Sequence, residues 1–166
     1  NHCPSSGPSM DIDNNIIALS YRISDTATSY INCSDISFLS FTNEVNINPS
    51  EASPNFSDIV LHNDYIHVGW IDYETDNPDV LYGVSQIGSD EIVNKQRMNQ
   101  NFEDGYIMQK DPKLYWHTVY QDDQLNERLF YFWSDKRGTF YQLFYRVSKS
   151  NYVLGDLNND EHVDIL

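Results

Sequence analysis

The sequence predicts an all-β protein, because its composition and its local pattern both favour strands. Apolar residues make up 40% of the 166 residues and aromatic residues 14%, which is too much apolar surface for a disordered chain. Runs in which apolar and polar residues alternate recur along the chain, as expected of half-buried strands. The length suits one domain with a sizeable core, with or without a short appendage.

Three aromatic-rich runs indicate a repeat of about fifty residues. They are NNIIALSYRIS from Asn14, NDYIHVGWIDY from Asn63 and DPKLYWHTVYQDD from Asp111. Each begins with polar residues that favour turns and then alternates as a strand does. Tyr21, Trp70 and Tyr120 take the same place in the three runs, at spacings of 49 and 50 residues.

Other strand candidates surround each of these runs. A second run follows each first run, in the order CSDISFLSFTN, NPDVLYGVSQIG and NERLFYFWSDKRG. Shorter candidates, PSMDID, SDIVLH and GYIMQK, precede the first runs, and a weaker fourth strand is clearest as YQLFYRVS. Each unit is therefore predicted to have four strands, and four-stranded antiparallel units at this period are typical of β-propeller blades. A β-sandwich with accidental spacing is the alternative.

The predicted organisation is three propeller-like blades, at about 1–50, 51–100 and 101–150, with a tail at 151–166. Three blades cannot close a ring, because propellers usually have four to eight. Open edges and exposed apolar faces invite association. We therefore expect that the chain is part of a longer protein, that two copies pair, or that another chain of an assembly completes the sheet.

The charge of the chain excludes some partners. The net charge is -15, with only 10 Lys and Arg residues. A nucleic-acid partner is not expected, because phosphate binding needs clustered basic residues. An anionic membrane surface is disfavoured for the same reason. No apolar run is long enough for a membrane span, which needs about 18 residues or more.

The two cysteines and the acidic, lysine-poor composition favour a secreted protein. In an oxidising compartment Cys3 and Cys33 would form a disulfide that fixes the N-terminus to a strand. In a reducing compartment they would be two separate thiols, and this alternative stays open. The expected location is extracellular.

The units resemble the blades of sialidase-like β-propellers, which carry the BNR or Asp-box motif. The opening HCPSSGPSMDID with NNIIALSYR resembles a first blade, and YIHVGWIDYETDNPDVLYGVS and RLFYFWSDKRGTFYQLFYRVS resemble two more. The third carries a degenerate Asp box with shifted spacing, made of Ser134, Asp135, Gly138, Thr139 and Phe140. In this family the Asp box is a structural turn away from the ligand face, so the resemblance implies a structural role for these residues.

The tail resembles the first half of a type I dockerin repeat, whose loop binds calcium as an EF-hand does. Glu161 replaces the usual glycine, and position 12 of the loop would fall after Leu166. Both departures weaken the expected binding, and an acidic turn without metal is the alternative. The oxygen ligands that the EF-hand pattern implies are Asp156, Asn158, Asp160, His162 through its main-chain oxygen, and Asp164.

The family resemblance also implies where a ligand would bind. It implies that the loops at 22–32, 72–78 and 121–127 form the ligand face. Asp72 and Asp122 are expected to hold equal places in two blades, which makes them candidates for the two carboxylates of a glycoside hydrolase. A sialidase is not expected, because the family's cluster of three arginines on the substrate carboxylate is missing. The candidate ligand-binding residues are Arg22, Asp25, Asp72, Glu74, Asp122 and Asp123.

The function predicted from these observations is a secreted, non-catalytic module that binds a glycan or a surface protein. Polar loops would recognise the ligand, and calcium would make the tail rigid. One alternative is a secreted glycoside hydrolase of the sialidase-like propeller type that uses Asp72 and Asp122. The other is a structural subunit of an extracellular filament or surface assembly.

Overall fold

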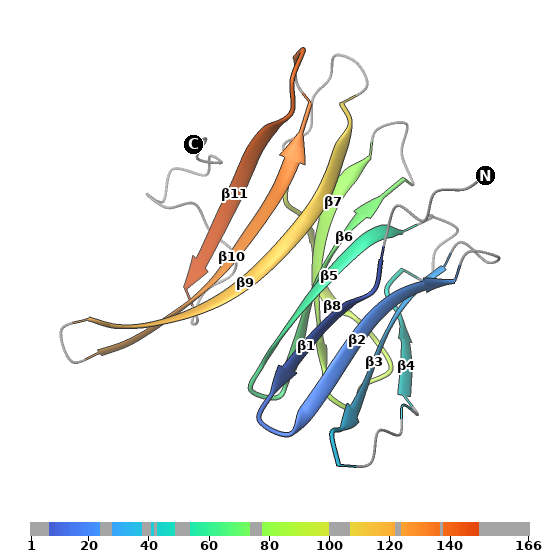
Figure 1. Cartoon of the computed structure of the whole chain (residues 1–166), viewed down its shortest axis with the longest axis vertical. Coiled ribbons are helices and arrows are strands. Elements are labelled where there is room, and N and C mark those ends of the chain that lie inside the picture. Colours follow the sequence, from blue (N-terminus) through green and yellow to red (C-terminus); the bar gives the residue numbers. More distant parts are fainter. Residues whose placement is uncertain are drawn as a thin grey trace.

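A computed structural model of the chain confirms the all-β prediction, and its strands form three antiparallel sheets (Figure 1). The described residues are 7–23, 28–37, 41, 43–48, 54–73, 78–99, 107–121, 124–136 and 138–149. In this part of the chain the three sheets do not close into a ring.

The strands follow one another within each sheet, as in propeller blades. Sheet 1 has the order β1 (Ser9–Asp13), β2 (Ile16–Ile23), β3 (Thr28–Asp35) and β4 (Asn43–Asn46). Sheet 2 has the order β5 (Asn55–His62), β6 (Tyr65–Asp72), β7 (Asp79–Gln86) and β8 (Val93–Arg97). Sheet 3 has the order β9 (Gln109–Gln121), β10 (Gln124–Asp135) and β11 (Gln142–Lys149).

The first and second strands of sheets 1 and 2 are joined by the same kind of turn, which begins with an asparagine. Asn14 begins the β1–β2 turn with φ 51°, and Asn63 begins the β5–β6 turn with φ 53°. Asparagine tolerates this left-handed conformation better than most residues. The two turns place β2 and β6 at equal positions, so the predicted correspondence of these runs is confirmed.

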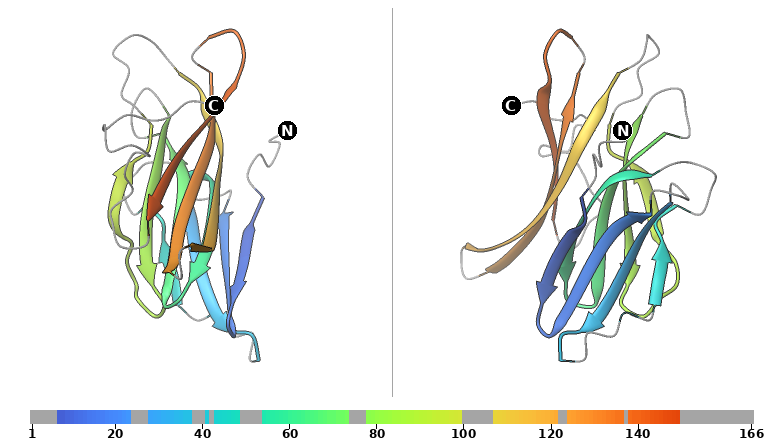
Figure 2. Two further views of the ribbon diagram at one scale, coloured as in Figure 1. Left: turned by 90° about the vertical axis from the view of Figure 1, so that its left-hand side faces the viewer. Right: turned by 45° about the vertical axis from the view of Figure 1, so that its right-hand side comes forward.

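Sheet 2 lies between the other two sheets, and each of its faces contributes to one of two apolar cores (Figure 2). Trp70 packs with Ala18 and Ile31 of sheet 1. On the other face, Tyr82 belongs to a core with Trp133 of sheet 3. Burial of this apolar surface holds the sheets together.

The predicted strand assignment is wrong for the third unit. Trp133 of β10 takes the place of Trp70 of β6, because Trp70 pairs with Leu81 and Trp133 with Phe144 in the same register. Tyr120 is therefore not the third equivalent residue. β9 is the first strand of its sheet, and it begins with residues that were predicted to end a separate strand at 105–110. Four strands are confirmed in sheets 1 and 2, and sheet 3 has three within the described residues.

A close approach between sheets 2 and 3 makes Gly69 necessary. A Cβ atom added at Gly69 would lie 2.5 Å from Tyr131 Oη. Tyr131 cannot easily move, because it is fully buried and its hydroxyl donates a hydrogen bond to Leu81 O at 2.7 Å.

We expect Gly69→Ala to lower the free energy of unfolding by about 1–3 kcal/mol through overpacking. Urea denaturation measures this. Gly138→Ala is the matched control, because no atom lies within 4 Å of its added Cβ. Equal stability of the two variants would contradict the packing described for Gly69.

Candidate functional site

A cavity of about 510 Å³ lies between the first strands of the three sheets. We call it the first-strand cavity. β5 contacts both β1 and β9, so this strand joins the two sides of the site. The lining residues are Ser9–Asp13 of β1, Asp58–His62 of β5, and Leu114, Tyr115, Trp116 and Thr118 of β9.

Carboxylates from one first strand bond to the backbone of the next. Asp11 Oδ2 accepts a hydrogen bond from Leu61 N at 2.7 Å, and Asp58 Oδ2 accepts one from Leu114 N at 2.8 Å. First strands stand at sheet edges, where backbone N–H groups lack a partner strand. The carboxylates satisfy these donors and so link the sheets.

Asp58 is the most strongly held carboxylate of the cavity. Its Oδ1 accepts hydrogen bonds from Ser9 Oγ at 2.6 Å and from Lys113 Nζ at 3.0 Å. Asp58 is only 6% exposed. With donors on both oxygens and a cation beside it, Asp58 serves mainly to fasten the three first strands together.

Asp13 is held less firmly. Its Oδ2 accepts one hydrogen bond, from Asn63 N at 3.2 Å, and a carboxylate oxygen can accept more than one. Neither Asp13 nor Asp11 has an ion-pair partner among the described residues. These two carboxylates therefore keep their negative charge unpaired at the cavity wall.

Aromatic rings of β9 form another part of the wall. The side chain of Tyr115 is 58% exposed. Trp116 stacks on His62, with ring centroids 3.8 Å apart and an interplanar angle of 16°. His62 Nε2 lies 3.1 Å from Glu127 Oε1, which helps to fix the orientation of its ring. The cavity thus combines carboxylate acceptors with flat apolar surfaces.

A second histidine lies behind this wall. The ring of His67 is 5.0 Å from that of Trp116, and its Nδ1 lies 2.7 Å from the hydroxyl of Tyr82. Burial lowers the pKa of His67 to about 4, with a smaller contribution from the charge of His62. Burial also raises the pKa of the Tyr82 hydroxyl. Both groups are therefore neutral near pH 7.

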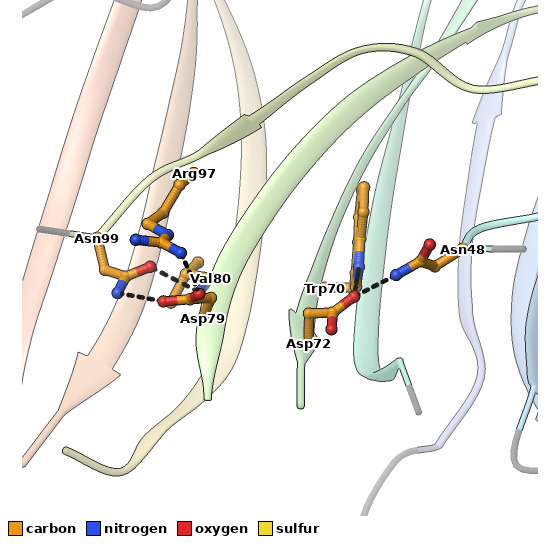
Figure 3. Close-up of polar contacts among 7 residues, drawn as sticks. All are labelled: Asn48, Trp70, Asp72, Asp79, Val80, Arg97 and Asn99. Carbon is orange, nitrogen blue, oxygen red and sulfur yellow. Dashed lines mark hydrogen bonds and ion pairs between the residues drawn. The ribbon is translucent and has the colours of Figure 1, made fainter. Parts of the chain in front are cut away.

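Asp72, the candidate carboxylate for the glycoside hydrolase alternative, lies at the end of β6 (Figure 3) and does not line the first-strand cavity. It is 2% exposed. Its Oδ2 accepts a short hydrogen bond from Asn48 Nδ2 and another from Trp70 Nε1 at 3.3 Å. Because Asn48 follows the last strand of sheet 1, Asp72 links two sheets.

A similar polar cluster holds the start of β7 (Figure 3). Arg97 Nη2 lies 2.6 Å from Asp79 Oδ2, and Asn99 Nδ2 donates to Asp79 Oδ1 at 3.1 Å. Asn99 Oδ1 in turn accepts a hydrogen bond from Val80 N at 2.8 Å. These contacts satisfy the polar groups at this end of sheet 2. We therefore assign this cluster a structural role and not a ligand-binding one.

The predicted equivalence of Asp72 and Asp122 is wrong. Asp72 pairs with Asp79, and the residue that pairs in the same way in sheet 3 is Asp135, opposite Gln142. The residue of sheet 3 that corresponds to Asp72 is therefore Asp135, whereas Asp122 lies outside the described residues.

The other predicted site residues fall on β2, on β3 or outside the described residues. Arg22 lies on β2, and its Nε donates to Pro54 O at 3.3 Å. Cys33 lies on β3 and is partly buried, while its predicted partner Cys3 is not described. The disulfide thus stays a prediction. Also outside the described residues are Asp25, Glu74, Asp122, Asp123 and the predicted calcium ligands Asp156, Asn158, Asp160, His162 and Asp164.

Sequence reasoning missed the residues of the first-strand cavity. Asp11, Asp13 and Asp58 lie in the short runs PSMDID and SDIVLH, which were recognised only as strands. The signal that could have found them is the presence of aspartates inside strand candidates, two in PSMDID and one in SDIVLH.

Two absences hold for the described part of the chain. It contains no group of three His, Cys, Asp or Glu side chains that could hold a metal ion. A helix of the length and hydropathy needed to span a membrane is also not found there.

Comparisons with known proteins find similarity only among solved structures. No protein-family model matches the chain, and no curated protein does. One similar structure is the GH32 β-fructofuranosidase BmSUC1 of Bombyx mori, with 14% identity and a TM-score of 0.49 over 98% of this chain and 38% of that chain. Another is the GH43 protein BlXynB of Bacillus licheniformis, with 7% identity and a TM-score of 0.45 over 95% of this chain and 42% of that chain. The chain thus spans about two fifths of the length of these proteins.

Proposed function

We propose that the chain is a carbohydrate-binding part of a propeller-like protein and that the first-strand cavity holds the sugar. The observation that carries this proposal is the joint presence of carboxylates and an exposed aromatic ring around one cavity of about 510 Å³. The volume falls within the range of small-molecule sites, and such sites combine apolar walls with a few polar groups.

The chemistry of the wall suits a sugar ring. The C–H face of a sugar can lie against the ring of Tyr115, which offers a large apolar area with few rotatable bonds. The hydroxyl groups of the sugar can donate hydrogen bonds to the carboxylates of Asp11 and Asp13, which are acceptors only when ionised. No covalent chemistry is needed for this role.

Removal of one ring tests the proposal. We expect Tyr115→Ala to weaken oligosaccharide binding about tenfold, the effect of losing roughly 1.4 kcal/mol of contact energy. Titration calorimetry with a panel of soluble neutral and amino oligosaccharides measures the change.

Tyr120→Ala is the matched control for this test. Tyr120 lies on the same strand and is 79% exposed, but it does not line the cavity. We expect it to leave binding unchanged. Binding that survives Tyr115→Ala, or that Tyr120→Ala reduces equally, would contradict a site at the cavity.

A glycoside hydrolase is the second candidate, favoured by the presence of three carboxylates around one cavity. Such enzymes use a pair of carboxyl groups about 5–10 Å apart. Asp58 is already engaged by Lys113 and Leu114, which leaves Asp11 and Asp13 to act. Release of new reducing ends from a bound oligosaccharide would support hydrolysis, and binding without release would support the non-catalytic role.

We also propose the finer assignments that the sequence supports. These are sialidase-like blades, secretion, the disulfide between Cys3 and Cys33, and a dockerin-like calcium loop at 156–164. A structural subunit of an extracellular assembly is a further candidate, supported by the open sheets. Native mass spectrometry with calcium and then with a chelator tests two of these proposals. The number of calcium ions per chain tests the calcium loop, and the number of copies in the complex tests the assembly.

A further inference from the structure

We propose that the first-strand cavity selects sugars by charge, with a preference for amino sugars over neutral sugars and exclusion of carbohydrate acids. The ligand class is thus an oligosaccharide that carries protonated amines. This inference rests on the proposed function, since it assigns the ligand of the same site.

The charges at the cavity wall are predominantly negative. Among the described residues, three aspartates line the cavity and no lysine or arginine does, and His62 of the lining lies against Glu127. Lys113 Nζ, 3.0 Å from Asp58 Oδ1, compensates that carboxylate. Asp11 and Asp13 accept hydrogen bonds from backbone N–H groups, and neither has a cationic partner among the described residues.

A carbohydrate acid needs a cationic partner for its carboxylate. Carboxylates of sugars are bound best by guanidinium groups, which offer two parallel hydrogen bonds. Among the described residues, no arginine lines the cavity to make such a contact. An acidic sugar would meet Asp11 and Asp13 without a compensating cation, and like charges repel at this range.

The cavity offers apolar surface as well as negative charge. Tyr115, Trp116 and His62 are all among the lining residues and supply apolar contact area, with the Trp116 ring stacked on that of His62. A cation held over an aromatic face gains further attraction. An amino sugar can use both features, because its C–H face is apolar and its amine is charged.

The experiment compares three oligosaccharides of equal length by titration calorimetry at pH 6 and low salt. They are oligomers of glucosamine, of N-acetylglucosamine and of galacturonic acid. We expect the glucosamine oligomer to bind tightest, the N-acetylated oligomer more weakly, and the galacturonate oligomer not measurably. Added salt should weaken the first most, because exposed charge interactions are screened.

Two variants separate the cavity from the general acidity of the surface. Asp13→Asn should weaken binding of the glucosamine oligomer about fivefold, the upper range for one exposed charge pair, and should change the N-acetylated oligomer less than twofold. Asp90→Asn makes the same charge change at an exposed site away from the cavity and should change neither. Thermal melting of each variant confirms that it is folded.

Each outcome decides the question. Equal binding of the amino and N-acetylated oligomers, or binding of the galacturonate oligomer, would overturn the charge selection while the proposed function stands. An effect of Asp90→Asn as large as that of Asp13→Asn would show attraction to the whole surface and would also overturn it. Failure of all three oligomers to bind would overturn the proposed function itself.

Discussion

Replacing Asp72 by alanine is expected to lower the free energy of unfolding by about 2–4 kcal/mol. The substitution leaves two donors without their acceptor, the Asn48 amide and the Trp70 indole, in a buried setting. Each buried polar group that loses its partner costs about 1–3 kcal/mol. Urea denaturation, with the midpoint and slope fitted together, measures the loss.

The same variant separates a structural role from a catalytic one. If Asp72 were a catalytic acid, Asp72→Ala would abolish hydrolysis and leave stability nearly unchanged. The structural role predicts the reverse, with destabilisation and no effect on sugar binding in the folded fraction. Asp90→Ala serves as the control, because Asp90 is exposed and its removal should change stability by less than about 0.5 kcal/mol.

Acidification is expected to destabilise the protein through His67, by about 3 kcal/mol at pH 4. The pKa of His67 is lowered from 6.5 to about 4 in the folded chain, first by burial and then by His62. Between these values the unfolded chain binds the proton and the folded chain does not, so stability falls as pH falls. The contribution of neutral His67 to the free energy of unfolding is complete above pH 6.5 and is lost progressively as the pH falls toward 4.

His67→Phe tests the assignment of this pH dependence. The variant should be less stable at pH 7, because the Tyr82 hydroxyl loses its partner. Between pH 6.5 and 4, its free energy of unfolding should fall less steeply with pH, because the contribution of His67 to that slope is gone. His117→Phe is the control, since His117 is exposed on β9 and should leave the slope intact. An unchanged slope in His67→Phe would assign the acid sensitivity to other groups.

The sequence predicts the first two sheets well because their turns are local. Asn14 and Asn63 set the start of the second strand in each sheet by a backbone conformation that asparagine favours. The third unit departs from this pattern, because β9 is a long strand that contains a bulge near Asp111, where φ is 54°. Its alternation resembles that of a second strand, which explains the wrong assignment of Tyr120.

The site could not be predicted in the same way. Asp11 and Leu61 lie on strands of different sheets and meet only because the sheets pack side by side. No local pattern contains that information. Conversely, Asp72 looks like an ordinary loop acid in the sequence, and only the packing of Asn48 and Trp70 around it shows that it is buried.

The most direct test of the central claim is a map of backbone amide shifts in the isotope-labelled chain during titration with the oligosaccharide that binds best. A sugar held in the first-strand cavity should give its largest shifts on Asp11–Asp13, on His62, and on Tyr115, Trp116 and Thr118, which line the cavity. Shifts centred on Asp72 and Asp79, with the cavity residues unchanged, would contradict a binding site at the first-strand cavity. They would indicate that the ligand binds at the ends of β6 and β7 instead.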